Sequence, residues 1–386
     1  MSETINKILY TNSNSNKFAL ERLTTVYEPD ERNTKEQCTY AKIIRLEHNG
    51  ENNGTLLVTR ETVWAPDERY PIYRSTDDGE TWSEIARVGD NLNENSIPGY
   101  QPYLCEIPKD MGSFKKGTIL LAACTRIPDT GGQRTIMTLY SSADVGKSWN
   151  AFCNVDVGGK YNSDLHKSEG LWEPLLIFEE ETGRMYCFYS DELDPMHSQR
   201  LVYKYSTDLV NWSEKYECVA CEDRYLRPGM IAIAKMGNGK YALVFEMYGL
   251  DACPIYIKFA SKLDDWGDIS DYGKFIANSE GKGMGSAPAA AWTPDGGECG
   301  TLLVTAHHTV NGHSNTKCDL FLSFDYGNTF VSIDNPIPNR HNHNIRSGYS
   351  PGFFIAEDNS IYYVNNPERA EGSTNEKLMF AKIKVY

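Results

Sequence analysis

Short apolar runs separated by polar turns recur along the whole chain, and their spacing predicts strands. Five of these runs begin at a proline, namely those at 102–107, 174–178, 228–233, 288–292 and 351–355. A sixth run, at 39–46, has the same character without the proline. Proline is tolerated at the first residue of a strand, because its missing N–H harms no ladder there. The pattern therefore predicts six equivalent strands.

A turn and a second apolar run follow each of these predicted strands. Two of the turns contain Asn-Gly, at Asn53-Gly54 and Asn238-Gly239, and Asn-Gly between apolar runs is the strongest short-range signal for a hairpin. We therefore expect each unit to begin with an antiparallel hairpin. The second strands are predicted at 55–59, 118–122, 185–189, 241–245, 301–305 and 361–364.

A second repeat, Ser-x-Asp-x-Gly-x-Thr-Trp, runs in phase with the strands. Clear copies start at Ser75 and Ser142, a third with Phe in place of Trp starts at Ser323, and two degenerate copies start at Ser206 and Ser261. The intervals of 67, 64, 55 and 62 residues indicate a repeated supersecondary unit.

The chemistry of this repeat suits a turn. Asp and Ser side chains can bond backbone N–H groups, glycine supplies a positive φ, and the aromatic residue can pack between neighbouring sheets. One active site needs only one or two carboxylates, so a carboxylate repeated in every unit is predicted to be structural. This prediction applies to Asp77, Asp144 and Asp325.

The repeat resembles the Asp-box, or BNR repeat, of sialidase-like propellers. The resemblance implies an all-β fold, a six-bladed β-propeller with four antiparallel strands per blade, forming a single catalytic domain over residues 1–386. Only three strands remain after Pro351. We therefore expect a segment within Lys17 to Tyr27 to complete the last blade and remove an exposed sheet edge.

Composition narrows the possible partners. The formal net charge of −15 disfavours nucleic acid and anionic membranes, and no run of 18 apolar residues is present. The start of the chain lacks the apolar core of a signal peptide, and ten Cys residues are dispersed singly, which favours a cytoplasmic location. A protein whose export signal had been removed would look the same and would be secreted. The sequence leaves the oligomeric state open, with a monomer favoured.

Metal and cofactor sites are not predicted. Cys218-Val-Ala-Cys221 has the spacing of a zinc site but no second pair accompanies it, and His341-Asn-His343 lies in a polar loop.

Residues just before each first strand, and at the end of each second strand, should converge on one mouth of the propeller axis. These positions hold a dense set of acids, guanidinium groups and aromatic rings, which suits a carbohydrate pocket. The predicted substrate-binding residues are Tyr100, Gln101, Arg126, Trp172, Asp191, Arg227, Ser286, His308, Arg346 and Tyr349.

Two glutamates stand out among these positions. Glu173 lies between Trp172 and Pro174, and Glu246 ends the apolar run 241–245. Desolvation in such surroundings raises the pKa of a carboxyl group, and glycoside hydrolysis needs one proton-donating and one ionised carboxyl group. The alternative is that either Glu forms an ion pair with Arg227 or Arg126.

The segments at 168–178, 189–192, 226–230 and 238–246 resemble glycoside hydrolase family 93. Members of this family are exo-acting arabinanases that release arabinobiose from α-1,5-linked L-arabinan with retention. The resemblance implies that the Glu of Trp-Glu-Pro, Glu173, is the general acid/base and that Glu246 is the nucleophile. It implies an arabinan or arabino-oligosaccharide substrate.

Two other functions remain open from the sequence. An exo-sialidase would use Tyr349 activated by Glu246, with Arg60, Arg227 and Arg346 around the substrate carboxylate. Against it, Arg126-Ile-Pro128 lies in the second repeat rather than the first. A non-catalytic glycan-binding propeller would keep Trp172, Tyr100 and Tyr349 for stacking without needing two buried carboxylates.

Overall fold

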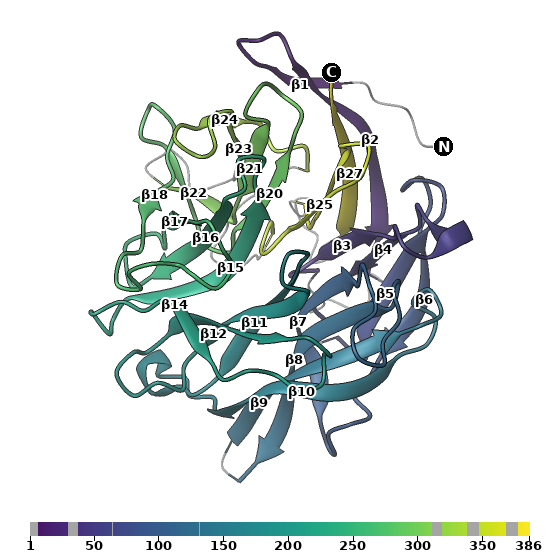
Figure 1. Cartoon of the computed structure of the whole chain (residues 1–386), viewed down its shortest axis with the longest axis vertical. Coiled ribbons are helices and arrows are strands. Elements are labelled where there is room, and N and C mark those ends of the chain that lie inside the picture. Colours follow the sequence, from purple (N-terminus) through teal and green to yellow (C-terminus); the bar gives the residue numbers. More distant parts are fainter. Residues whose placement is uncertain are drawn as a thin grey trace.

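The computed structural model describes residues 7–29, 38–63, 65–130, 132–310, 319–337, 347–367 and 377–386. Its regular elements within these ranges are β-strands and two short 3-10 turns, η1 (Gly50–Asn52) and η2 (Leu165–Lys167). Six antiparallel sheets form the blades of a ring, and a small two-stranded sheet is added to it (Figure 1). The six-bladed propeller predicted from the sequence is confirmed.

The first three blades each contain four strands in simple up-and-down order. Their strands are β3 (Lys42–Arg45), β4 (Leu56–Thr59), β5 (Tyr70–Ser75) and β6 (Ser83–Val88); β7 (Ile97–Glu106), β8 (Ile119–Asp129), β9 (Gly132–Ser142) and β10 (Asn150–Lys160); β11 (Leu171–Glu179), β12 (Arg184–Asp191), β13 (Arg200–Ser206) and β14 (Tyr216–Val219).

The fourth and fifth blades follow the same plan, and β19 of the short β19–β22 sheet contacts β17 of the fourth. The strands are β15 (Arg227–Lys235), β16 (Tyr241–Tyr248), β17 (Ile255–Ala260) and β18 (Lys274–Phe275); β19 (Gly283–Gly285), β20 (Ala289–Thr293), β21 (Thr301–Thr305), β22 (His308–Val310), β23 (Leu320–Ser323) and β24 (Val331–Ile333). The sequence did not predict the β19–β22 pair.

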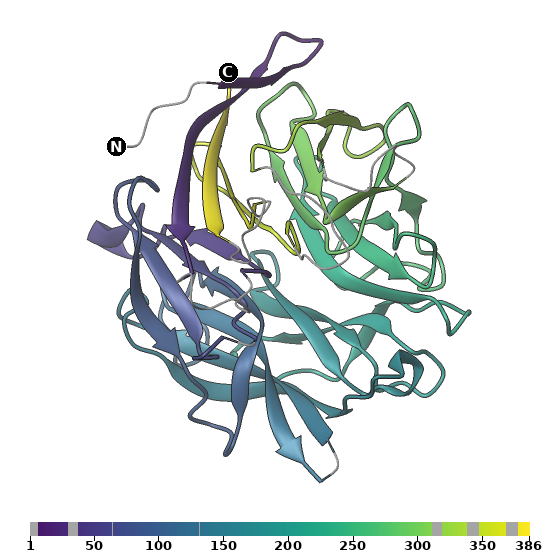
Figure 2. The same cartoon turned by 180° about the vertical axis from the view of Figure 1, so that it is seen from behind.

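The sixth blade is built from both ends of the chain. Its inner strands are β25 (Gly352–Ile355), β26 (Ile361–Asn365) and β27 (Leu378–Val385), and β2 (Lys17–Tyr27) pairs with β27. The strands β2 and β27 lie side by side in both views (Figure 2). The fourth strand therefore comes from the predicted segment. The sequence did not predict β1 (Lys7–Thr11), which extends this blade to five strands.

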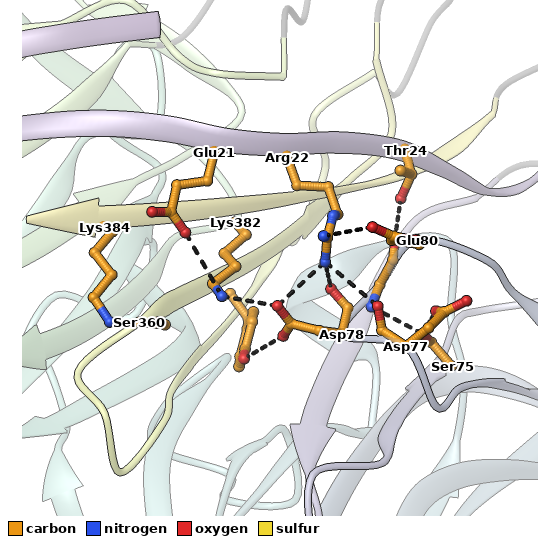
Figure 3. A network of polar contacts seen from close by, with 12 residues as sticks. Glu21, Arg22, Thr24, Ser75, Asp77, Asp78, Glu80, Ser360, Lys382 and Lys384 are labelled. Atoms are coloured by element: carbon orange, nitrogen blue, oxygen red, sulfur yellow. Dashed lines mark hydrogen bonds and ion pairs between the residues drawn. The ribbon is translucent and has the colours of Figure 1, made fainter. Parts of the chain in front are cut away.

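A polar network joins this closing blade to the first Asp box (Figure 3). The Arg22 guanidinium forms ion pairs with Asp78 and Glu80, and Lys382 Nζ lies 2.8 Å from Asp78 Oδ2. The Thr24 hydroxyl donates to the Gly79 carbonyl at 2.7 Å. The network links the N- and C-terminal strands to blade 1, so it closes the ring.

The Asp boxes form the turns that the sequence predicted. In the second box, Asp144 accepts hydrogen bonds from the Ser142 hydroxyl, the Ser148 hydroxyl and the Ser148 N–H at 2.7–2.9 Å. The boxes at Asp77 and Asp325 repeat these contacts. These aspartates therefore hold turns, and each is bonded within its own box.

The aromatic residues of the boxes pack between blades. The Trp82 ring of blade 1 lies 5.4 Å from the Phe380 ring of β27, and its indole N–H donates to the Gly79 carbonyl at 3.2 Å. Trp266 is buried in the cluster that joins blades 3 and 4. Each indole satisfies its N–H within its own turn and places its apolar surface against the next blade.

The entry to each inner strand has an unusual backbone conformation. One residue per blade adopts a positive φ of 51–60°, although none of them is glycine: they are Tyr40, Gln101, Glu173, Met230, Ala287 and Ser350. Left-handed backbone is costly for such residues and persists only where the surrounding structure enforces it. Five of these six residues line the narrow channel along the axis. The ring of left-handed residues therefore sets which side chains meet at the axis.

The proline pattern misplaced this position in blade 4. The sequence aligned Arg227-Pro228 with Glu173-Pro174, but the left-handed residue is Met230, three residues later. The register of β15 and β16 shifts between Gly229 and Ala232, as that of β11 and β12 shifts between Trp172 and Leu175, so Met230 and Glu173 occupy the same place in equivalent bulges. Met230, rather than Arg227, is therefore the counterpart of Glu173.

No helix within the described ranges is long and apolar enough to cross a membrane.

Candidate active site

A cavity of about 330 Å³ opens at one mouth of the propeller axis. It is lined from several blades, and Tyr40, Gln101, Glu173 and Met230 continue from it into the axial channel. Eight residues singled out from the sequence line it: Tyr100, Gln101, Arg126, Trp172, Glu173, Arg227, Glu246 and Tyr349. A pocket of this volume suits a small ligand or the end of a longer one.

Glu173 lies at the entry to β11, where its left-handed backbone turns the side chain toward the axis. Its Oε2 accepts a hydrogen bond from the Ser190 hydroxyl at 2.7 Å, and its Oε1 accepts one from Gln101 Nε2 at 3.1 Å. The Glu173 N–H donates to Gln101 Oε1 at 3.0 Å, so Gln101 bonds both the backbone and the side chain. This arrangement fixes the rotamer of Glu173.

The environment of Glu173 favours its protonated form. Burial, assisted by the negative charge of Glu246, raises the pKa of Glu173 to about 8, against the lowering effect of the Ser190 hydrogen bond. At neutral pH this carboxyl group therefore holds a proton, as a general acid must.

Glu246 lies on β16 in the neighbouring blade and is buried. Its Oε2 accepts the Ala287 N–H at 2.7 Å and the Ser286 hydroxyl at 3.1 Å. Burial raises the pKa of Glu246, and the hydrogen bonds from Ala287 and Ser286 oppose that rise. Donors to the ionised form are what a carboxylate nucleophile requires, so the two glutamates have different surroundings.

The predicted residue Ser286 is thus placed behind Glu246, where it positions the carboxylate. It directly follows β19, which ends at Gly285, three residues before Pro288 at the start of the inner strand of blade 5. Ser286 and Ala287 both have positive φ, so the backbone turns there and presents the Ala287 N–H to Glu246.

An aromatic wall stands beside Glu173. The Trp172 ring meets the rings of Tyr100 and Tyr161 edge to face, each with a centroid distance of 5.9 Å. The Arg126 guanidinium lies 4.7 Å from the Tyr100 ring centre and forms an ion pair with Glu68. Arg126 therefore supports the wall and does not pair with Glu173.

Arg227 lines the cavity, and its guanidinium group binds other groups of the protein. It forms a buried ion pair with Glu192 and donates to the carbonyls of Leu165 and Ser198 at 2.6 and 2.8 Å. It also donates to Gln199 Oε1 at 2.8 Å. Arg227 therefore holds the loop around Leu165 against the cavity.

Asp191 points away from the cavity. It is buried and pairs with Arg200 and Lys215 at 2.8 and 3.0 Å. Side chains alternate along a strand, so Ser190 reaches Glu173 and Asp191 faces the opposite side of the sheet.

The remaining predicted residues lie in different places. The Tyr349 ring contacts Tyr40 and His307, with centroid distances of 5.5 and 5.0 Å. His308 does not line the cavity: its Nε2 lies 2.9 Å from the Ala252 carbonyl, and burial lowers its pKa. Arg346 and the His341-Asn-His343 motif lie outside the described residues.

Several site residues were absent from the predicted set. Tyr40 accepts a hydrogen bond from Gln101 at 3.3 Å, and Glu192 and Gln199 hold Arg227. Tyr40 occupies the same left-handed position as Glu173, but Ala41 rather than a proline follows it, so the proline pattern did not identify it. Glu192 was detectable, because strand alternation places it on the same side as Ser190.

The arginine cluster of a sialidase is not assembled by the described residues. Arg227 is paired with Glu192, and Arg60 is fully buried, donates to the Tyr73 hydroxyl at 3.2 Å and does not line the cavity. Glu246 accepts hydrogen bonds from the Ala287 N–H, the Ser286 hydroxyl and the Cys253 thiol. These contacts do not favour the sialidase alternative.

Within the described ranges, no group of three His, Cys, Asp or Glu side chains could hold a metal ion. Cys218 and Cys221 are both buried and free, and Cys221 Sγ lies 3.9 Å from Met247 Sδ.

Solved glycoside hydrolases share the six-bladed propeller fold of this chain. An α-L-arabinanase from Penicillium chrysogenum, solved with arabinobiose, is 29% identical at a TM-score of 0.77, covering 93% of this chain and 97% of that one. The GH93 α-L-arabinofuranosidase of Fusarium graminearum with arabinobiose is 25% identical at a TM-score of 0.78, covering 94% and 97%.

More distant matches share the fold alone. The NanB sialidase of Streptococcus pneumoniae is 10% identical at a TM-score of 0.56, covering 94% of this chain and 70% of that one. No protein-family profile and no curated protein sequence matches the chain.

The arabinanase and arabinofuranosidase structures confirm the resemblance to glycoside hydrolase family 93. The chain is a glycoside hydrolase of that structural type.

Proposed function

We propose that this protein is a retaining, exo-acting glycoside hydrolase that cleaves α-1,5-linked L-arabinan or arabino-oligosaccharides and releases arabinobiose. The observation that carries the proposal is the pair of carboxyl groups in one cavity, one protonated at neutral pH and one surrounded by hydrogen-bond donors. The two relatives solved with arabinobiose support the choice of sugar.

The surroundings of the two glutamates assign their roles. Glu173, with a pKa of about 8, donates its proton to the glycosidic oxygen while the Glu246 carboxylate attacks the anomeric carbon. The glycosidic bond breaks and a glycosyl–Glu246 ester forms. The ionised Glu173 then removes a proton from water, which attacks the ester and regenerates both groups.

Hydrogen bonds around the pair suit this sequence of steps. Gln101 and Ser190 keep Glu173 in one orientation through both its acid and its base role. Ser286 and the Ala287 N–H balance the charge of Glu246 before attack, when it is ionised. Preorganised groups of this kind avoid reorganisation during the reaction.

The proposal is tested by incubating the protein with linear α-1,5-arabinan, arabino-oligosaccharides and a sialoside, with products separated by chromatography. Arabinobiose is the expected product, and NMR should detect it first in the anomeric configuration of the substrate. Free sialic acid would favour the sialidase alternative. Binding of the sugars without any cleavage would favour a glycan-binding propeller.

A matched control is available on the same strand. Glu179 is a buried carboxyl group at the other end of β11, bonded to the Thr182 hydroxyl at 2.6 Å and far from the cavity lining. Glu179→Gln should release arabinobiose, whereas Glu173→Gln and Glu246→Gln should not.

A further inference from the structure

Exposed tyrosines are concentrated at the rim of the cavity. Four tyrosines of the described chain are strongly exposed: Tyr161, Tyr225, Tyr248 and Tyr386, at 50%, 64%, 48% and 60%. Tyr161 and Tyr248 line the cavity, and Tyr386 ends the closing blade. Large apolar surface left in water beside a pocket indicates a binding surface.

Tyr161 extends the aromatic wall to the rim of the cavity. It follows β10, and its N–H donates to the Gln133 carbonyl at 2.9 Å, which fixes the backbone. Its ring meets Trp172 edge to face at an interplanar angle of 89°. The wall therefore runs from Tyr100 beside Glu173 outward to a half-exposed ring.

Tyr248, at the end of β16 in blade 4, is a second exposed tyrosine that lines the cavity. It lies two residues after Glu246 on β16, so strand alternation puts both side chains on the same face. Glu246 is buried and Tyr248 is exposed, so this face runs from the catalytic carboxylate to the solvent.

The backbone of Tyr225 lies against Gly249, the residue that follows Tyr248. Gly249 has a φ of 104°, and a Cβ there would lie 2.3 Å from the Tyr225 carbonyl oxygen. The Tyr225 ring contacts His166 edge to face at 5.0 Å, and the neighbouring Leu165 lines the cavity. The ring is held in place while 64% of the residue remains exposed.

We propose that Tyr161, Tyr225 and Tyr248 form an outer platform that binds the sugar residues of the polysaccharide chain lying beyond the scissile bond. The inference rests on the proposed function and adds to it. Tyrosine rings present an apolar face to sugar C–H groups and a hydroxyl to water, which suits stacking at a wet boundary. The platform makes the enzyme favour long chains over the shortest cleavable oligosaccharide.

The test compares kcat/KM for linear arabinan with kcat/KM for the arabino-trisaccharide. In the wild type, kcat/KM for linear arabinan, counted per chain end, should be about tenfold or more above kcat/KM for the trisaccharide. Tyr225→Ala should reduce the ratio by about tenfold, since one aromatic contact has about that effect. Tyr225→Phe should retain the wild-type ratio because it keeps the ring.

Tyr386→Ala is the matched control, because this tyrosine is similarly exposed but lies on the closing blade. It should leave the ratio at the wild-type value. Equal kcat/KM for both substrates in the wild type, or an unchanged ratio in Tyr225→Ala, would overturn the platform. Failure to cleave either substrate would instead overturn the proposed function, so the two failures are distinguishable.

Discussion

The Asp-box carboxylates and the two axial glutamates show how position in the propeller decides what a carboxyl group does. Partial burial raises the pKa of Asp144, but hydrogen bonds from Ser148 outweigh it and lower the pKa below its ordinary value. Burial raises the pKa of Glu173 to about 8. The box carboxylates are ionised and bonded within their own turns, whereas Glu173 holds a proton.

The difference follows from the symmetry of the fold. A box serves its own blade, so each copy makes the same local contacts. The axis is shared, and each blade contributes a different side chain from the same left-handed position: Tyr40, Gln101, Glu173, Met230, Ala287 and Ser350. The residues that repeat from blade to blade therefore have structural roles, and the residues that differ between blades at the axis form the candidate site.

The largest expected effect is on catalysis. Glu246→Gln should lower kcat/KM for linear arabinan by about a thousandfold or more, because the amide cannot form the glycosyl ester. Asp144→Asn, the comparable change in a box, should remain within a fewfold of wild type. Steady-state kinetics on arabinan measure both, and comparable losses in the two variants would erase the distinction between the regions.

The second effect is on stability. Asp144→Ala removes the acceptor for several hydrogen bonds in one turn, and we expect unfolding free energy to fall by about 2–3 kcal/mol. Chemical denaturation followed by tryptophan fluorescence measures it. A loss of activity at full stability would show instead that this box takes part in catalysis.

A third prediction concerns pH. Between the ordinary carboxyl pKa of 4.5 and the raised pKa of about 8, folded Glu173 keeps a proton that the unfolded chain releases, so its effect destabilises the fold as pH rises. Glu173→Gln removes this penalty. The variant should gain little relative to wild type at pH 4.5 and about 4–5 kcal/mol at pH 8.5, because one pKa unit corresponds to about 1.4 kcal/mol.

Thermal unfolding of both proteins across this range checks the sign. A stability difference that stays constant with pH would mean that Glu173 ionises normally.

The smallest effect concerns ring closure. Arg22→Ala removes the ion pairs to Asp78 and Glu80, which are partly exposed, so we expect a loss of about 1 kcal/mol. The loss should shrink in high salt, because screening weakens such pairs. Chemical denaturation at low and high ionic strength measures this loss of stability. A loss that does not depend on salt would contradict an electrostatic contribution of the Arg22 ion pairs to ring closure.

Much of the fold was predictable from the sequence because local patterns specify it. The boxes mark one turn in each of the first five blades, and counting the strands after Pro351 predicts that β2 closes the ring. The left-handed position of blade 4 was not predictable: Met230 lies in a bulge that depends on the pairing of β15 with β16, and Pro228 offered a misleading alignment.

The site was predictable in its main residues and less so in its supporting contacts. Glu173 and Glu246 share one cavity, as the sequence suggested. Asp191 was expected there, but strand alternation turns it toward Arg200 and Lys215. Arg227 was expected to bind substrate, but it pairs with Glu192. The sequence alone does not reveal an ion pair between residues so far apart in the chain.

The most direct test of the account is a ¹³C NMR titration of the Glu173 carboxyl group in the wild type and in Glu246→Gln. The account predicts a pKa near 8 in the wild type. It predicts a lower pKa in Glu246→Gln, where the neighbouring negative charge is gone. A Glu173 carboxyl group that titrates near 4.5 in both proteins would contradict the paired acid and nucleophile on which the proposed hydrolysis depends.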